Sequence, residues 1–266
     1  MTETDQVRYL YLIANTEEER SLGDIGLGDR PVYTIVFQDI AAVVHASKPE
    51  PEPAKSEEQA KQWILNHNYV IDKATENFNT VLPFSFGCLA RGDDESIKRW
   101  LQNNYGLYKR ELDRLKNSAE YSIQVFYDPE ILEKQVIETI PELKEIDQKM
   151  EIMPRGKAYL FKKKFELGLK QAVSDHLANM GKEFEKLIKE NATQTIFEEK
   201  ISYVPEKYAG KKVMAAFSCL VAQENVDRLG QSLERINKRE GFAVRFTGPW
   251  APFNFVDLKG NTEDDT

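Results

Sequence analysis

The side chains that most often carry out chemistry are sparse in this sequence. His67 and His176 each fall within the apolar stripe of an expected helix. An imidazole in that setting is more often a hydrogen-bonded core or interface residue than a ligand or proton shuttle. Cys88 and Cys219 lie in apolar runs, far apart in the sequence, which favours buried free thiols over a disulfide or a metal site. These residues alone do not indicate an active site.

The sequence also lacks the short motifs that carry a known mechanism. It has no HExxH zinc motif, no cluster of Cys and His, no Asp-rich calcium loop and no GxSxG nucleophile elbow. The segment GDIGLGD at 23–29 lacks the Lys-Ser/Thr ending of a phosphate-binding loop and opens no helix, so we interpret it as a surface turn. We therefore expect no catalytic residue, no metal and no cofactor.

The basic run RGKAYLFKKK at 155–164 is the one local concentration of positive charge. Arg155 and Lys157 lie at an expected helix start, and Lys162 and Lys163 follow about one turn later. Free backbone N–H groups at a helix start also favour an anion, so these four side chains are candidates for binding an acidic partner. A solvated helix face is the alternative interpretation of the same residues.

Bulk composition limits the class of protein. A length of 266 residues with 41% hydrophobic content suits one large or two ordinary globular domains. The net charge of −8 argues against a nucleic-acid partner, because phosphate binding depends on clustered Lys and Arg. No run of about 18 apolar residues occurs, and the first residues do not resemble a secretory signal. We therefore expect a cytoplasmic protein with no membrane partner.

Apolar periodicity predicts an N-terminal α+β domain over residues 1–117. Strands are expected at 7–14, 31–37, 40–46 and 81–90. Helices are expected over 57–78 and 93–115, the second broken near Gly106. Ser56 and Gln59 have the spacing of a capping box at the start of the first helix. Beyond it, apolar residues at steps of three and four form one continuous stripe from Ala60 to Phe78.

From residue 118 the order of expected elements is strand, helix, strand, strand, helix, strand, which is the ferredoxin-like (βαββαβ) arrangement. Strands are expected at 120–128, 194–203, 212–221 and 242–246, and helical segments over 129–149, 157–191 and 226–236. We therefore predict an α+β protein whose C-terminal domain, 118–255, is ferredoxin-like with a long helix and an extended C-terminal strap. A polar tail over 256–266 completes the chain.

The closing segment FTGPWAPFNF at 246–255 combines aromatic rings with prolines that exclude a helix. We expect Phe246 to end the last strand and the rest to form the strap. Trp250, Phe253 and Phe255 are candidates for partner contact, because large rings contribute much of the energy of protein interfaces. A Trp between two prolines most often packs on its own domain, however. We therefore expect a mainly structural segment, in which Trp250→Ala harms folding more than partner binding.

Four segments in this order resemble the gas vesicle protein F/L family (GvpF/GvpL). They are Tyr9-Leu10-Tyr11 in the first strand, Thr80 to Gly87 after the helix that carries His67, Gly156 with Tyr159-Leu160 at the start of the long helix, and Thr247 to Phe255. Two positions depart from the family pattern. Phe253 stands where the family often has Tyr, which removes a hydroxyl, and Ala251 stands where a second proline is more common.

The resemblance implies a gas vesicle accessory protein, a minor component or assembly factor that binds the hydrophobic shell subunit during gas vesicle formation, and it does not lead us to expect an enzyme. It also implies contacts with other gas vesicle accessory proteins and a location at the gas vesicle, within the cytoplasm. An alternative is a small-ligand-binding regulatory or enzymatic protein with a ferredoxin-like domain, because one fold hosts many functions. RNA binding through such a sheet is a third hypothesis, which the acidic balance disfavours.

Overall fold

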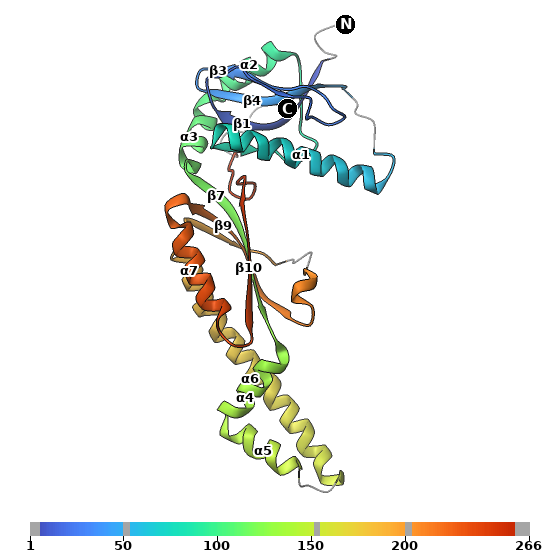
Figure 1. Ribbon diagram of the computed structural model, residues 1–266, viewed down its shortest axis with the longest axis vertical. Helices are drawn as coiled ribbons and strands as arrows, with labels where there is room; N and C mark the ends of the chain where they lie inside the picture. The colour runs from blue at the N-terminus through green and yellow to red at the C-terminus, as the bar shows by residue number, and fades with distance from the viewer. Residues whose placement is uncertain (1–5, 50–53, 152–154, 200–203, 259–266) are drawn as a thin grey trace. The chain divides into compact units, whose positions relative to one another are not determined.

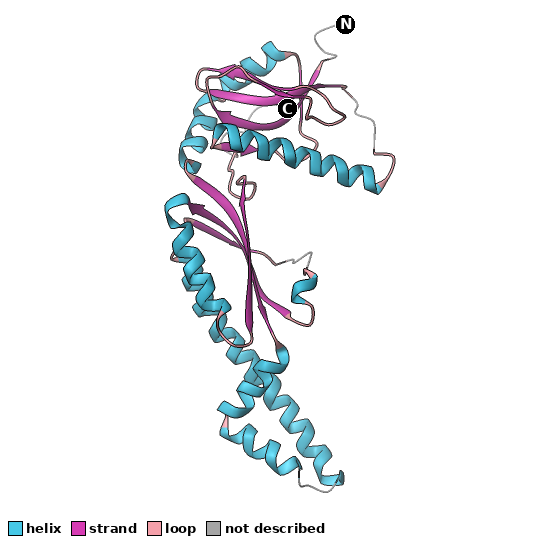
Figure 2. Cartoon of the chain, in the orientation of Figure 1, coloured by secondary structure: helices cyan, strands magenta, loops and turns pink. Residues whose placement is uncertain are grey.

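The structure is a computed structural model that describes residues 6–49, 54–151, 155–199 and 204–258, without the side chains of residues 151–160 (Figure 1). It is a mixed helix and sheet protein, which confirms the predicted α+β class (Figure 2). The chain forms two compact units, the first made of residues 1–120 and 249–266 and the second of residues 121–248. The closing residues 249–255, which we expected in the C-terminal domain, therefore belong to the first unit.

A sheet with the strand order β2-β3-β4-β1-β5, to which β6 is added by pairing with β1, forms the centre of the first unit. Its strands are β1 (Val7–Asn15), β2 (Ser21–Gly23), β3 (Val32–Phe37), β4 (Ile40–Ser47), β5 (Val81–Pro83) and β6 (Leu89–Arg91). A register shift in β1 between Leu10 and Leu12 interrupts the alternation of side chains. Tyr9, Tyr11 and Leu12 therefore all enter one core cluster.

Helix α1 (Glu57–Phe78) packs against this core cluster through Val70, Ile71 and Ala74. The Ser56 hydroxyl accepts a hydrogen bond from the Gln59 backbone at 3.1 Å, as the capping box predicts. The Gln59 side chain instead accepts from the backbone N–H of the residue before Ser56. Two shorter helices follow, α2 (Asp94–Asn103) and α3 (Tyr105–Leu115), with the break at Asn104, two residues before the predicted one.

The single strand predicted over 81–90 is wrong. β5 and β6 pair with different parts of β1, and residues 84–88 leave the sheet between them as a loop. Gly87 turns this loop with a φ of 88°, a conformation that favours glycine. The loop carries Phe86 out of the sheet.

The second unit contains a sheet with the strand order β10-β7-β9-β8 and a long helix, α6. Its elements are β7 (Ser118–Tyr127), α4 (Pro129–Thr139), α5 (Pro141–Glu151), α6 (Arg155–Lys189), β8 (Gln194–Phe197), β9 (Lys212–Ala222), α7 (Val226–Asn237) and β10 (Phe242–Trp250). Val136, Leu143 and Phe165 form a small core where α4, α5 and α6 meet (Figure 1). The end of the strand predicted over 194–203 falls on residues 200–203, outside the described residues.

The last strand is longer than predicted. We expected it to end at Phe246, but β10 continues to Trp250 despite Pro249. β10 lies at an edge of its sheet, where a missing backbone N–H costs no ladder hydrogen bond if that side faces away from the neighbouring strand. The strap therefore begins only at Ala251. The expected polar tail lies outside the described residues from 259 onward.

Candidate functional site

The apolar stripe of α1 is covered by the sheet along only part of its length. The C-terminal part, from His67 to Phe78, is buried as the periodicity predicts. The N-terminal part is not, and Ile64 is 44% exposed although it belongs to the same stripe. An amphipathic helix whose apolar face runs beyond its own core leaves that face available for another contact.

The uncovered part of the stripe lines a groove of about 540 Å³, which we call the α1 groove. Apolar side chains from three parts of the first unit form its walls: Leu27, Trp63, Ile64, Phe86 and Leu89. Phe86 is 42% exposed and comes from the loop between β5 and β6. The groove thus offers a concave apolar surface of the size typical of binding sites.

The loop that carries Phe86 is held from beneath by Tyr9 and His67. The Tyr9 hydroxyl accepts a hydrogen bond from the Gly87 backbone at 2.9 Å and lies 2.9 Å from His67 Nδ1. His67 Nε2 lies 3.1 Å from the Phe84 carbonyl oxygen, to which it can only donate. Tyr9 must therefore donate to Nδ1. His67 is the hydrogen-bonded core residue that the sequence predicts.

A second pair, Tyr11 and His45, lies beside the first. The Tyr11 hydroxyl is 2.9 Å from His45 Nδ1 and accepts from the Leu27 backbone at 3.1 Å. The rings of Tyr9 and His45 stack with their centres 5.0 Å apart. Burial, with a smaller contribution from the positive charge of Arg30, lowers the pKa of His45 to about 4. The imidazole is therefore neutral at pH 7.

These groups support binding better than catalysis. Burial raises the pKa of Tyr9 to about 12 and also raises the pKa of the Cys88 thiol, so neither group supplies an anionic nucleophile at neutral pH. No group of three or more His, Cys, Asp or Glu side chains suited to a metal ion occurs among the described residues. The arrangement provides apolar contact area and a few hydrogen-bonding groups.

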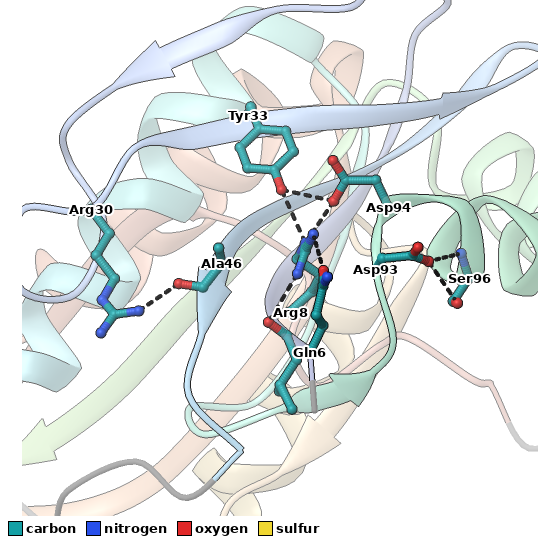
Figure 3. Close-up of polar contacts among 9 residues, drawn as sticks. Gln6, Arg8, Arg30, Tyr33, Ala46, Asp93, Asp94 and Ser96 are labelled. Atoms are coloured by element: carbon teal, nitrogen blue, oxygen red, sulfur yellow. Dashed lines mark hydrogen bonds and ion pairs between the residues drawn. The ribbon is translucent and has the colours of Figure 1, made fainter. Parts of the chain in front are cut away.

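A polar network on the first unit joins the start of α2 to the sheet (Figure 3). Arg8 Nε lies 2.6 Å from Asp94 Oδ1 and 3.0 Å from the Tyr33 hydroxyl, which itself donates to the same carboxylate oxygen at 2.8 Å. Asp93 caps the helix by accepting from the Ser96 backbone at 2.9 Å. Each of these polar groups has a partner, so we assign the network a structural role. Sequence patterns place Asp93 and Asp94 at a helix start but did not predict the contact of Asp94 with Arg8 and Tyr33.

Two buried carboxylates, which the sequence interpretation also missed, hold the closing strap to the first unit. Glu120 accepts hydrogen bonds from the Asn254 backbone at 2.9 Å and from its side-chain amide at 2.6 Å. Glu111 pairs with Arg114, which donates to the Phe255 carbonyl oxygen at 2.5 Å. The strap is therefore fixed by its backbone as well as by its rings.

Comparison with known proteins gives the family. The sequence model of the family described as "Gas vesicle synthesis protein GvpL/GvpF" matches residues 7–257. The chain belongs to this family. The resemblance to the GvpF/GvpL family that the four segments carry is thereby confirmed.

Curated relatives of this GvpL/GvpF family member carry the same names. The chain is 30% identical to Gas vesicle protein L of Haloferax mediterranei, over 87% of this chain and 72% of that protein. It is 29% identical to Gas vesicle protein L1 of Halobacterium salinarum, over 94% of this chain and 90% of that protein. These names describe gas vesicle proteins and not a type of enzyme.

Solved structures share the fold. The crystal structure of GvpF from Anabaena superposes with a TM-score of 0.69 at 19% identity, covering 95% of this chain and 99% of that one. GvpF from Microcystis aeruginosa gives a TM-score of 0.63 at 18% identity, with the same coverage. Among the described residues of this family member, no helix combines the length and apolar character needed to cross a membrane.

The residues that the sequence suggests for partner contact in this family member differ in how exposed their side chains are. Trp250 and Phe253 are 44% and 41% exposed, whereas Phe255 is only 5% exposed. Trp250 is thus partly covered and partly exposed, and the expectation that Trp250→Ala harms folding more than partner binding stays a prediction; Phe255 is buried. Lys162 and Lys163 are exposed on α6, and Lys162 Nζ lies 3.9 Å from a Glu166 oxygen. Arg155 and Lys157 belong to α6, but their side chains lie outside the described residues.

Proposed function

We propose that this GvpL/GvpF family member is an accessory protein that binds the hydrophobic shell subunit during gas vesicle formation, as a minor component or assembly factor at the gas vesicle within the cytoplasm. The observation that carries the proposal is the α1 groove. Ile64 and Phe86 are more than two-fifths exposed there, yet hydrogen bonds from beneath hold the Phe86 loop in place.

The energetics of such a contact are favourable. Fully burying one exposed large apolar side chain contributes about 1.5–3 kcal/mol, so Ile64 and Phe86, each a little over two-fifths exposed, contribute about half as much each when a partner covers them. The loop is already ordered by Tyr9 and His67, which lowers the entropy lost on binding. The net charge of −8 helps to keep a complex with an aggregation-prone partner dispersed.

Co-purification with the shell subunit tests the proposal. We expect the double variant Ile64→Ser with Phe86→Ser to lose most of the co-purified shell subunit while the wild-type chain retains it. The control is Leu167→Ser, which removes a 63% exposed apolar side chain from α6. Equal recovery with the wild type and both variants would contradict a role for the groove. Complete absence of the shell subunit with the wild-type chain would contradict the proposed function itself.

The basic start of α6 and the closing segment are further proposed contact surfaces. The exposure of Lys162, Lys163, Trp250 and Phe253 supports such a role, whereas the burial of Phe255 argues against direct contact by that ring. The charge reversals Lys162→Glu and Lys163→Glu should weaken binding of an acidic partner and reduce its salt dependence. If binding and its salt dependence are unchanged, these lysines belong to a solvated helix face.

We also propose that the second unit is a ferredoxin-like domain. Its chain order from β7 to β10 and its strand order β10-β7-β9-β8 support this, since the first and last strands are neighbours and the third strand separates the first from the second. The helical segment between the first two strands is extended by α4 and α5. A superposition on an experimental structure of this unit would test the assignment.

A further inference from the structure

The lining of the α1 groove combines its apolar walls with positively charged and hydrogen-bonding side chains, namely Arg30, His45, Ser47 and Lys48. We propose that the groove recognises a carboxylate side chain set in an apolar segment of the shell subunit, with Arg30 and His45 as its partners. This inference rests on the proposed function and specifies the chemistry of the segment that binds.

His45 is the first reason. The side chain is 2% exposed and lines the groove from β4, directly opposite Tyr9 in the sheet register. The Tyr11 hydroxyl accepts from Leu27, and His45 Nδ1 is the one acceptor that the described residues offer to its hydrogen, which leaves the imidazole hydrogen on Nε2. No hydrogen bond of Nε2 to another described residue is present.

The Nε2 N–H is therefore a donor without a protein acceptor in the part of the chain that the structure describes. Fully buried side-chain nitrogen and oxygen atoms among the described residues all have partners, so Nε2 must reach solvent, and the groove that His45 lines provides the opening. A nearly buried donor of this kind is costly to desolvate unless a ligand supplies an acceptor.

Arg30 is the second reason. One guanidinium nitrogen, Nη1, donates to the Ala46 carbonyl oxygen at 2.5 Å, which positions the side chain at the end of β4 (Figure 3). Arg30 makes no ion pair with any carboxylate of the described residues. None of the described residues that line the groove is acidic, although the whole chain carries eight more negative than positive charges.

The Arg30 guanidinium and the His45 imidazole N–H favour a carboxylate as the ligand. A guanidinium and a neutral imidazole N–H can both donate to a carboxylate, and a charged acceptor strengthens each bond. A strongly hydrated anion would gain little from the Trp63, Ile64 and Phe86 walls. A carboxylate on an apolar segment uses the walls and the donors together, which is the usual division between affinity and orientation in a binding site.

Peptides that tile the sequence of the shell subunit provide the test. We expect one acidic, apolar peptide to bind the full-length chain, measured by fluorescence anisotropy, and to lose about tenfold in affinity when its carboxylate is replaced by the amide (Glu→Gln or Asp→Asn). Arg30→Gln should cause a similar loss for the acidic peptide and almost none for the amide peptide. His45→Phe keeps a ring in the stack with Tyr9 and should also weaken binding of the acidic peptide more than binding of the amide peptide.

The controls separate this inference from the proposed function. Lys212→Gln removes an exposed positive charge from β9 of the second unit and should leave all affinities unchanged. If the shell subunit binds in a Phe86-dependent manner but neither the amide peptide nor Arg30→Gln changes affinity, the carboxylate inference is overturned and the proposed function stands. If sodium octanoate binds the groove and no shell peptide does, a small carboxylate is the ligand and the inference is overturned. If neither peptides nor intact shell subunit bind, both proposals fail.

Discussion

The first unit contains two aromatic regions, the closing strap and the α1 groove, which differ in how their hydrogen bonds hold them and in which side chains are buried. The strap backbone is bonded to Glu120 and Arg114, Phe255 of the strap is buried, and the backbone of Asp257 just after it is bonded to Glu111. In the α1 groove, Ile64 and Phe86 remain 44% and 42% exposed, and hydrogen bonds hold the backbone of the Phe86 loop. Aromatic content alone therefore does not distinguish a structural segment from a binding surface.

Polar anchors explain the difference. A buried carboxylate must be fully hydrogen-bonded, so Glu120 fixes the strap in one position by accepting from Asn254. In the groove, Tyr9 and His67 bond to the backbone of the Phe86 loop from beneath and leave the Phe86 ring 42% exposed. The buried part of the strap, around Phe255, should accordingly contribute to stability, and the groove should contribute to binding.

The largest expected effect comes from the strap. Phe255→Ala should lower the free energy of unfolding by about 3–5 kcal/mol, because it empties a buried aromatic site. Phe253→Ala, two residues earlier and 41% exposed, is the matched control and should cost less than about 1 kcal/mol. Urea titration of both variants measures the difference. Equal costs would show that the strap is not held to the first unit as described.

Acid should weaken the floor of the groove. The unfolded His45 pKa is near 6.5 and the folded pKa is about 4, so the unfolded state binds the proton first. The resulting destabilisation of the folded state is absent above pH 6.5 and grows as the pH falls toward 4. It reaches at most about 3 kcal/mol. Urea titrations at pH 7.5 and 4.5 should show a smaller loss for His45→Phe than for the wild type. An identical loss would mean that folding does not lower the pKa of His45.

Glu120→Gln should have an intermediate effect. The substitution removes the charge from two hydrogen bonds to Asn254 and places an amide N–H₂ where one oxygen accepted, which should cost about 2 kcal/mol. Thermal unfolding measures this cost. Glu130→Gln, an exposed carboxylate on α4, is the control and should change the midpoint little. A midpoint unchanged in both variants would argue that packing alone holds the strap.

Sequence patterns predicted where helices and strands form better than they predicted which other parts of the chain contact them. The period of the α1 stripe is visible in the sequence, but the sheet covers only its second half, because β5 and β6 are separated by the loop that carries Phe86. The pairing of Glu120 with Asn254 joins residues far apart in the chain and has no local signal. Trp250 lies in a recognisable motif, yet neither its exposure nor the continuation of β10 through Pro249 follows from that motif.

The smallest expected effect on stability lies in the groove, and a matched pair on α1 isolates it. Ile64 and Ile71 belong to the same stripe, two helical turns apart, but Ile64 is 44% exposed and Ile71 is fully buried. Ile71→Ala should cost about 2–5 kcal/mol of unfolding free energy, whereas Ile64→Ala should cost less than about 1 kcal/mol. Binding of the shell subunit should show the reverse order at protein concentrations where both variants are folded. If Ile64→Ala destabilises as much as Ile71→Ala, then the N-terminal half of the stripe is part of the core and the groove is closed in solution.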